Sequence, residues 1–218
     1  MNTTLLKSGL FFICLFVVPL TNYAQYDSKA EEILDKLSKK YEAIKSYKAE
    51  FVCELENPQA KVNDKFTGKI NVKGSKFTIL TGNQEIINNG TTVWTYLKDE
   101  NEVNISDYSP DNDEITPTKI YSIYKSGFKY LYSGEEKTKN GLFDTIELVP
   151  ENKNKPYFKI KIWVNRKEQT ISKWKIFEKN GNRFIYTVNN FQPNAKLEDA
   201  IFSFDKAKYK GVEVVDLR

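Results

Sequence analysis

The sequence predicts a mainly β protein whose strands form a large antiparallel sheet or barrel, preceded by one α-helix. Three observations support this fold class. From residue 49 onward, apolar and polar residues alternate with period two in short runs. Turn signals such as Asn89-Gly90 and Asn140-Gly141 separate these runs at spacings of about ten residues. Residues 27–47, which precede the runs, have helical spacing instead.

The expected helix begins near Asp27 and ends near Tyr47. Its apolar residues recur at intervals of three and four, so that they form one stripe: Ala30, Ile33, Leu34, Leu37, Tyr41 and Ile44. Acidic residues come early in this segment and lysines come late, which suits the helix dipole. We therefore expect the apolar stripe to pack on the sheet.

The runs with strand periodicity cover most of the remaining chain. They are residues 49–55, 66–73, 76–80, 84–88, 91–97, 102–106, 128–132, 142–149, 157–164, 170–178, 183–191 and 200–204. One interruption separates the sixth run from the seventh. Residues 111–114 are expected to form an acidic loop, and Thr116-Pro117 to open a short helix that ends at Ser126.

Several of these runs are apolar or aromatic on both faces. In residues 91–97, Val93 and Leu97 lie on one side and Trp94 and Tyr96 on the other. Such strands suit a sheet that wraps a cavity, which would account for an aromatic content of 14%. They suit a two-layer sandwich with an ordinary core equally well, and periodicity alone leaves both architectures open.

The N-terminus has the features of a secretory signal peptide. Lys7 provides a basic region, and residues 10–20 form an uncharged apolar run. That run is too short to span a bilayer, which takes about 20 helical residues. We expect cleavage after Ala24, so that residues 1–24 are the signal peptide and residues 25–218 form one domain. A retained anchor is the alternative, because Asn22 is a poor residue three positions before the cut.

The composition offers little for catalysis. The chain has no histidine, which excludes Ser-His-Asp and Cys-His pairs and removes the commonest nitrogen ligand of zinc. Asp111 and Asp113 resemble the start of a calcium loop, but Thr116 and Ser122 stand where a glycine and a glutamate belong. We therefore expect no enzyme, no metal site and no cofactor. Cys53 lies in a strand pattern and is expected to be a small core residue.

The charge also limits the class of partner. The net charge is +4, and no dense cluster of lysine and arginine interleaves with aromatic residues. We therefore expect no binding to nucleic acid.

Short segments spread over the chain match the motifs of one family in order. The most distinctive segment runs from Asn89 to Tyr96 (NGTTVWTY) and is similar to the family pattern Gly-x-x-(Leu/Val)-Trp-x-Tyr. The others are Ala49-Glu50-Phe51, Gly68-Lys69-Ile70-Asn71-Val72-Lys73, Lys76-Phe77, Thr116-Pro117, Ile201-Phe202-Ser203-Phe204 and Gly211-Val212-Glu213-Val214-Val215-Asp216. Together they cover nearly all of the expected mature chain, which resembles the periplasmic outer-membrane lipoprotein carrier family, LolA.

The resemblance implies an incomplete, half-closed antiparallel β-barrel of about 11 strands with an α-helical lid, in a single domain. It therefore favours the cavity over the sandwich. It places the lid residues at Leu37, Tyr41, Ile44, Ile120, Ile123 and Tyr124, and the wall of a lipid-binding cavity at Phe51, Phe77, Ile79, Trp94 and Tyr96. Ordinary core packing is the alternative role for each wall residue.

The resemblance also implies a function without catalysis. The protein would bind the acyl chains of lipoproteins in a hydrophobic cavity and ferry them through the periplasm to the outer membrane, acting as a monomer. Acylated lipoproteins would arrive from an inner-membrane ABC-type releasing complex and pass to the outer membrane or a receptor there. Two alternatives stay open: a related half-barrel lipid-binding or envelope-sensing protein, and an exported enzyme that acts on a lipid or glycan.

One position departs from the family pattern. Family members carry an arginine before the residue that matches Phe77, and this arginine hydrogen-bonds the lid shut. Here Gly74 occupies that position, and the loop is one residue shorter. Lys73 and Lys76 are the available substitutes, although an ammonium group does not reproduce the forked donor of a guanidinium.

Overall fold

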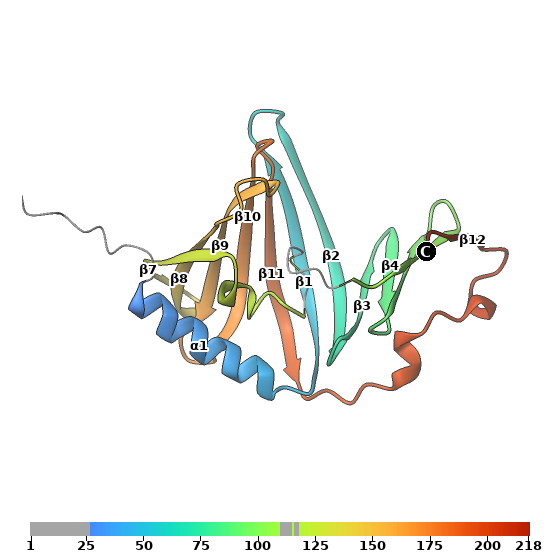
Figure 1. Cartoon of the computed structure of the whole chain (residues 1–218), viewed down its shortest axis with the longest axis horizontal. Helices are drawn as coiled ribbons and strands as arrows, with labels where there is room; N and C mark the ends of the chain where they lie inside the picture. The colour runs from blue at the N-terminus through green and yellow to red at the C-terminus, as the bar shows by residue number, and fades with distance from the viewer. Residues whose placement is uncertain (1–26, 110–114, 116–117) are drawn as a thin grey trace, which may run out of the picture.

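The structure is a computed structural model that describes residues 27–109, 115 and 118–218. In this part the chain forms one α-helix, short 3₁₀ helices and one twelve-stranded sheet (Figure 1). The elements are α1 (Ser28–Ala43), β1 (Ser46–Asn57), β2 (Val62–Lys73), β3 (Lys76–Thr81), β4 (Gln84–Asn88), β5 (Thr92–Leu97), β6 (Glu102–Asp107), η1 (Ile123–Lys125), β7 (Phe128–Thr138), β8 (Gly141–Pro150), β9 (Tyr157–Asn165), β10 (Thr170–Glu178), β11 (Arg183–Pro193), η2 (Asp199–Phe202), η3 (Lys206–Lys208) and β12 (Glu213–Asp216). The expected signal peptide, the acidic loop 111–114 and Thr116-Pro117 lie outside the described residues.

The order of the strands in the sheet is β12-β6-β5-β4-β3-β2-β1-β11-β10-β9-β8-β7. Adjacent strands are antiparallel except β12, which runs parallel to β6. Because β7 and β12 are both edges, the sheet does not close into a barrel. The predicted mainly β, half-closed single domain is therefore confirmed, with twelve strands rather than about eleven.

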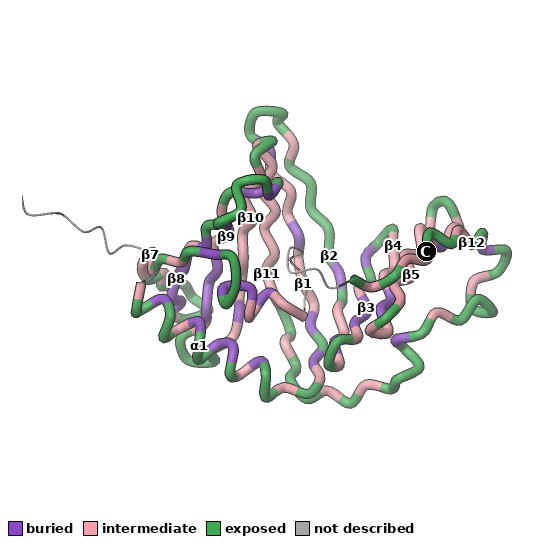
Figure 2. The backbone as a smooth tube through the Cα atoms, viewed as in Figure 1, coloured by how far each residue is buried: buried purple, intermediate pink, exposed green. Residues whose placement is uncertain are grey.

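Helix α1 packs on one face of the sheet, which we call the inner face; the opposite face is the outer face. Asp27 caps the start of the helix, and its carboxylate accepts hydrogen bonds from the backbone N–H groups of Lys29 (2.9 Å) and Ala30 (3.1 Å). It contacts β7 and β10 and buries Ala30, Leu34, Leu37 and Tyr41 of the predicted apolar stripe (Figure 2). No helix in the described part of the chain is both long and apolar enough to cross a membrane.

The helix is shorter than the sequence pattern predicts. It ends at Ala43, and Ile44 has extended backbone angles (φ −85°, ψ 112°). Ser46 and Tyr47, which the pattern assigns to the helix, begin β1 and pair with Lys73 and Val72 of β2. The pairing with β2 supplies backbone hydrogen bonds that override the helical spacing of the apolar residues.

The expected second helix is not formed as an α-helix. In the described residues from 118 onward the chain makes turns, followed by the single 3₁₀ turn η1. Ser122 provides no side-chain cap, and Ser126 is already extended where the chain enters β7. The segment is therefore too short for helical propagation to offset the cost of nucleation.

The C-terminal segment also differs from its predicted structure. Residues 200–204 are expected to form a strand, but the chain makes η2 there and Phe202 is buried. This segment packs on β3 and β4 from the outer face, where it has no free strand edge to pair with. The chain reaches the sheet again only at β12, which adds to the edge strand β6.

The hydrophobic core lies between α1 and the inner face of β7–β10. Its buried strand residues alternate along β8 and β9, as half-buried strands require. They are Ile146, Leu148, Ile160, Ile162 and Val164. Cys53, on β1, is also fully buried, and burial raises the pKa of its thiol, which confirms its predicted role as a core residue.

Candidate functional site

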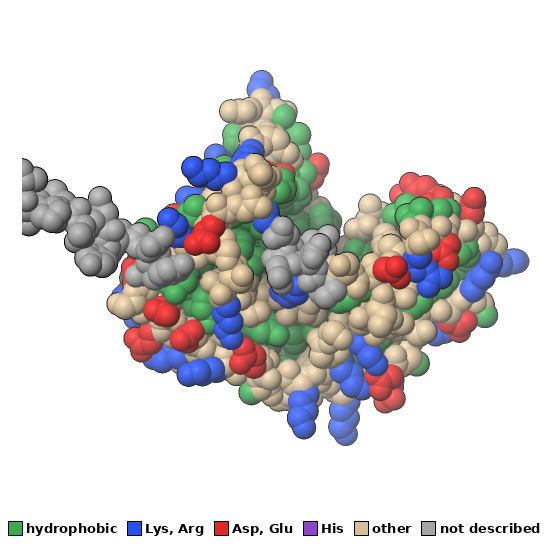
Figure 3. All heavy atoms as spheres, viewed as in Figure 1, with side chains coloured by type: hydrophobic (Ala, Val, Ile, Leu, Met, Phe, Trp, Pro, Cys, Tyr) green, Lys and Arg blue, Asp and Glu red, His purple; other side chains and the backbone are tan. Residues whose placement is uncertain are grey.

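A cavity of about 100 Å³ lies on the inner face, where α1 leaves the middle strands uncovered. In Figure 3, hydrophobic side chains are visible at the surface beside α1, over these strands. All the described residues that line the cavity are aliphatic or aromatic: Tyr41, Tyr47, Ala49, Phe51, Ile70, Ile79, Ile120, Ile171, Trp174, Tyr186, Val188 and Phe191. The site can therefore accept apolar groups but offers no charged side chain from its lining.

Strand register brings the floor of the cavity together. Ala49 on β1 pairs with Ile70 on β2, which pairs with Ile79 on β3. The neighbouring row contains Phe51 opposite Gly68, and a Cβ atom added to Gly68 would lie 2.4 Å from Cζ of Phe51. The Phe51 ring thus occupies the space where a side chain of β2 would be, and only glycine leaves room for it.

Aromatic residues form the end of the cavity below the helix. The Tyr41 ring stacks on Tyr121, with centroids 4.9 Å apart, and meets Tyr47 edge-on at 6.2 Å. The Tyr41 hydroxyl accepts a hydrogen bond from the backbone N–H of Ile171 (3.3 Å). Burial raises the pKa values of both Tyr41 and Tyr47, so neither hydroxyl adds a negative charge to the site near neutral pH.

The cavity is covered by α1 together with residues 118–125, which we call the lid. Ile120 lines the cavity from the second part of the lid. The Tyr124 hydroxyl donates to Asp35 Oδ1 on α1 (2.6 Å), and Lys125 Nζ lies 2.7 Å from Glu42 Oε1. These two contacts join η1 to α1. Ion pairing with Lys125 lowers the pKa of the Glu42 carboxyl, so the pair is charged at neutral pH.

The predicted lid residues all lie at the contact between the lid and the sheet. Leu37, Tyr41, Ile120 and Ile123 are buried, and Ile44 packs against the same cluster while partly exposed. Of these, Tyr41 and Ile120 reach the cavity itself. Their placement agrees with the expected positions, and their role in opening stays a prediction.

The predicted wall residues divide into two groups. Phe51 and Ile79 line the cavity. Phe77 is on the same face but packs in the core against Tyr108, with ring centroids 6.0 Å apart. The structure therefore places these three residues on the inner face.

Trp94 and Tyr96 lie on the outer face, which corrects their expected place in the cavity wall. The pairing of Ile79 with Ile86, and of Ile86 with Thr95, carries the inner face to Thr95 and turns its neighbours outward. The Tyr96 ring packs on Tyr209 of the C-terminal segment at 4.6 Å. Alternation correctly predicts that Trp94 and Tyr96 share a face, but it does not say which face is the inner one.

The expected lysine substitutes for the missing arginine have another partner. Lys73 Nζ lies 3.0 Å from Asp199 Oδ2, and Lys76 Nζ lies 3.1 Å from Asp199 Oδ1. Asp199 begins η2, so both lysines hold the C-terminal segment rather than the lid. The lid is instead joined by the contacts of Tyr124 and Lys125.

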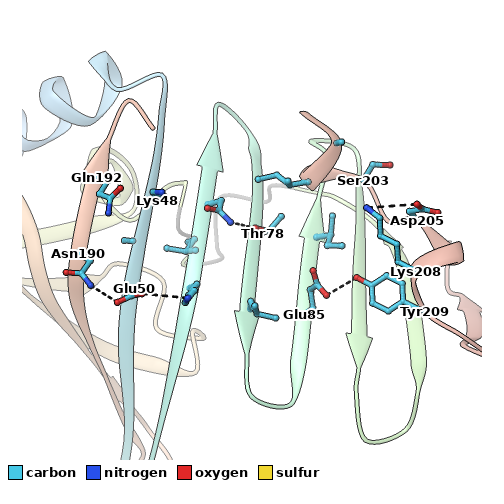
Figure 4. A pocket seen from close by; sticks show the side chains of 18 residues that line it. Lys48, Glu50, Thr78, Glu85, Asn190, Gln192, Ser203, Asp205, Lys208 and Tyr209 are labelled. Atoms are coloured by element: carbon cyan, nitrogen blue, oxygen red, sulfur yellow. Dashed lines mark hydrogen bonds and ion pairs between the residues drawn. The ribbon is translucent and has the colours of Figure 1, made fainter. Parts of the chain in front are cut away.

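A larger cleft of about 470 Å³ lies on the outer face, between β11, β1, β2, β3, β4 and the C-terminal segment (Figure 4). Its side chains are largely polar and engage one another. Glu50 accepts from Asn190 Nδ2 (2.6 Å) and lies 3.8 Å from Lys69 Nζ, while the Tyr209 hydroxyl donates to Glu85 (2.8 Å). Several polar side chains of the outer cleft thus bond to one another, and the smaller inner cavity, with its apolar lining, is the better candidate site.

Sequence reasoning missed the contribution of the last long strands to the site. Trp174 on β10 and Tyr186 on β11 are directly paired and stack with centroids 4.9 Å apart. Val188 and Phe191 on β11 also line the cavity. Period-two alternation does mark Tyr186 and Val188 as one face, but only the pairing of β11 with β1 brings that face beside Phe51.

The described residues hold no cluster of three or more Asp, Glu or Cys side chains that could bind a metal ion. An open antiparallel sheet with an apolar cavity beneath a helical lid defines the class of lidded half-barrel binding proteins. Residues 42–205 match the family described as outer membrane lipoprotein carrier protein LolA, and the chain belongs to this family. The fold of this family is a binding and carrier fold, and its proteins are periplasmic.

Solved structures with a similar fold are distant in sequence. An uncharacterized conserved protein from Thermus thermophilus matches with a TM-score of 0.58 and 14% identity, over 86% of this chain and 99% of that chain. A LolA superfamily protein from Nitrosomonas europaea matches with a TM-score of 0.44 and 14% identity, over 81% and 98%. LprF from Mycobacterium bovis gives 0.47 and 11%, over 83% and 100%. No curated protein sequence matches this chain.

Proposed function

We propose that this protein is a periplasmic carrier that binds the acyl chains of lipoproteins in the inner-face cavity and ferries them from the inner to the outer membrane. The observation that carries the proposal is the apolar cavity between the lid and the middle strands. Apolar contacts are graded and non-directional, which suits a protein that must release its cargo as well as bind it. Family membership supports lipoproteins as the class of cargo.

The energetics explain why such a carrier is needed. Each methylene group taken out of water is worth about 0.8 kcal/mol. A lipoprotein with three chains of roughly 16 carbons would therefore lose on the order of 35 kcal/mol if it entered water unprotected. The carrier has to offset most of this cost, and burial of the chains between the lid and the inner face does so without covalent chemistry.

The size of the cavity requires the lid to move. Its volume of about 100 Å³ is smaller than the roughly 150 Å³ of an engineered protein cavity that accepts one benzene molecule. A whole acyl chain therefore enters only when α1 separates from the sheet. The ion pair between Lys125 and Glu42 opposes the separation of α1 from the sheet only weakly, because both side chains are about half exposed (49% and 50%). Exposed pairs of this kind contribute about 0–1 kcal/mol.

The route of transfer follows from the same proposal. Residues 1–24 act as a cleaved signal peptide that delivers the chain to the periplasm. An inner-membrane ABC-type releasing complex supplies the acylated cargo, and the outer membrane or a receptor there accepts it. The carrier works as a monomer, with no cofactor and no catalytic step.

Native mass spectrometry tests the proposal directly. The protein is mixed with the acylated and the non-acylated form of one lipoprotein, and we expect a complex with the acylated form only. Ile79→Asp, in the cavity floor, should abolish the complex, whereas Leu80→Asp on the outer face should retain it. Equal binding of both lipoprotein forms would refute the carrier role. Turnover of a lipid ester would favour an enzyme instead.

A further inference from the structure

One buried polar atom of a cavity-lining residue lacks a hydrogen-bond partner. Trp174 lines the cavity, and its Nε1 atom is buried without a hydrogen bond. Among the described residues that line the cavity, it is the one buried side-chain nitrogen or oxygen without a hydrogen-bond partner. An indole N–H can only donate, so it needs an acceptor. Its burial without one is costly, and native proteins keep few such groups.

The neighbouring hydroxyl groups bond elsewhere, and neither is within hydrogen-bond distance of Trp174 Nε1. The Tyr41 hydroxyl accepts from the backbone N–H of Ile171, and the Tyr186 hydroxyl is hydrogen-bonded to the Cys53 thiol. A water molecule is a poor partner, because a buried water needs two to four polar partners and the lining is aliphatic and aromatic. The acceptor therefore has to come with the ligand.

The lining also determines which acceptor fits. No charged side chain of the described residues lines the cavity. A carboxylate would have to be buried there without a counter-ion, at a large desolvation cost. A neutral carbonyl at the head of an apolar chain satisfies Trp174 Nε1 without this penalty. Esters and amides of fatty acids have this combination, and free fatty acids at neutral pH do not.

We infer that Trp174 Nε1 donates a hydrogen bond to the ester or amide carbonyl of a bound acyl group. This inference rests on the proposed function and makes it more specific. Trp174 then distinguishes acylated cargo from free fatty acids and from alkyl chains that lack a carbonyl. It also fixes how deep the head of the chain lies, because the indole is held by its stacking on Tyr186 at 4.9 Å.

Displacement of the fluorescent probe 1-aminoanthracene tests the inference. Methyl laurate is compared with dodecyl methyl ether, in which a methylene group replaces the carbonyl, and with laurate anion. We expect wild-type protein to bind the ester about five-fold more tightly than the ether, as one neutral hydrogen bond allows. Trp174→Phe should bind ester and ether equally. Trp94→Phe, on the outer face, should keep the preference.

The indole N–H signals of the wild-type protein give a readout that needs no variant. We expect the Trp174 signal to move downfield with the ester and not with the ether, while the Trp94 signal stays in place. Equal affinity for ester and ether in wild-type protein, or a preference that survives Trp174→Phe, would overturn the inference and leave the proposed function standing. Failure of all these ligands to bind would refute the proposed function itself.

Discussion

The hydrogen bond between Tyr124 and Asp35 makes the closed lid testable. It joins η1 to α1 at 2.6 Å, and η1 continues directly into β7. Movement of α1 away from the sheet therefore breaks this bond. Tyr124→Phe removes the hydroxyl but keeps the ring, and Asp35 stays solvated because it is exposed. The variant thus weakens the closed state without leaving a buried charge.

The size of the effect follows from the chemistry of the bond. Hydrogen bonds to charged groups contribute about 1.5–3 kcal/mol, and the exposure of Asp35 argues for the lower end. About 1.4 kcal/mol corresponds to a factor of ten. If the closed cavity excludes whole acyl chains, the open fraction and the apparent affinity should both rise about ten-fold.

Two measurements check this prediction. Displacement of a fluorescent fatty-acyl probe should show tighter binding by Tyr124→Phe, and amide hydrogen exchange in Ser28–Ala43 should be faster. Tyr209→Phe is the matched control, because it removes a tyrosine–carboxylate bond of 2.8 Å on the outer face. It should lower stability without changing affinity. Unchanged binding by Tyr124→Phe, or an equal gain in both variants, would refute the reasoning about the lid.

Three further predictions concern the sheet. Gly68→Ala places a Cβ atom 2.4 Å from Cζ of Phe51 and should cost about 1–3 kcal/mol in urea unfolding; an unaltered midpoint would contradict the packing. The hydrogen bond from Arg166 lowers the pKa of the Asp144 carboxyl. The ionised Asp144 therefore stabilises the fold above a pH of about 4, and this stabilisation is lost as the pH falls further. Urea unfolding of Asp144→Asn should therefore lose less stability between pH 7 and pH 3 than the wild type. Trp94→Ala should lower the melting temperature but leave acyl-chain affinity unchanged, since an affinity loss would return Trp94 to the cavity wall.

Local patterns in the sequence predict most of the elements and their order, although they assign a short α-helix before β7 and a strand at residues 200–204 that the structure does not form. Helical spacing between Ala30 and Tyr41 predicts α1, because burial of one stripe needs that period. Alternation predicts the long strands, and Asn-Gly turns mark their ends. The order of short motifs indicates the family without any knowledge of contacts, and the family match confirms it. The resemblance placed Phe51 and Ile79 in the cavity wall and Tyr41 and Ile120 in the lid, and in the structure all four line the cavity.

The choice of inner face for each strand depends on the folded sheet. A period of two assigns Trp94 and Tyr96 to one face, but the register of β3, β4 and β5 makes that face the outer one. The partner of Lys73 and Lys76 was also beyond the sequence, because Asp199 is distant in the chain and reaches them only through the fold. The position of Trp174 at the cavity depends likewise on β11 pairing with β1. Contacts between segments far apart in sequence are set by the folded sheet, and local spacing carries no information about them.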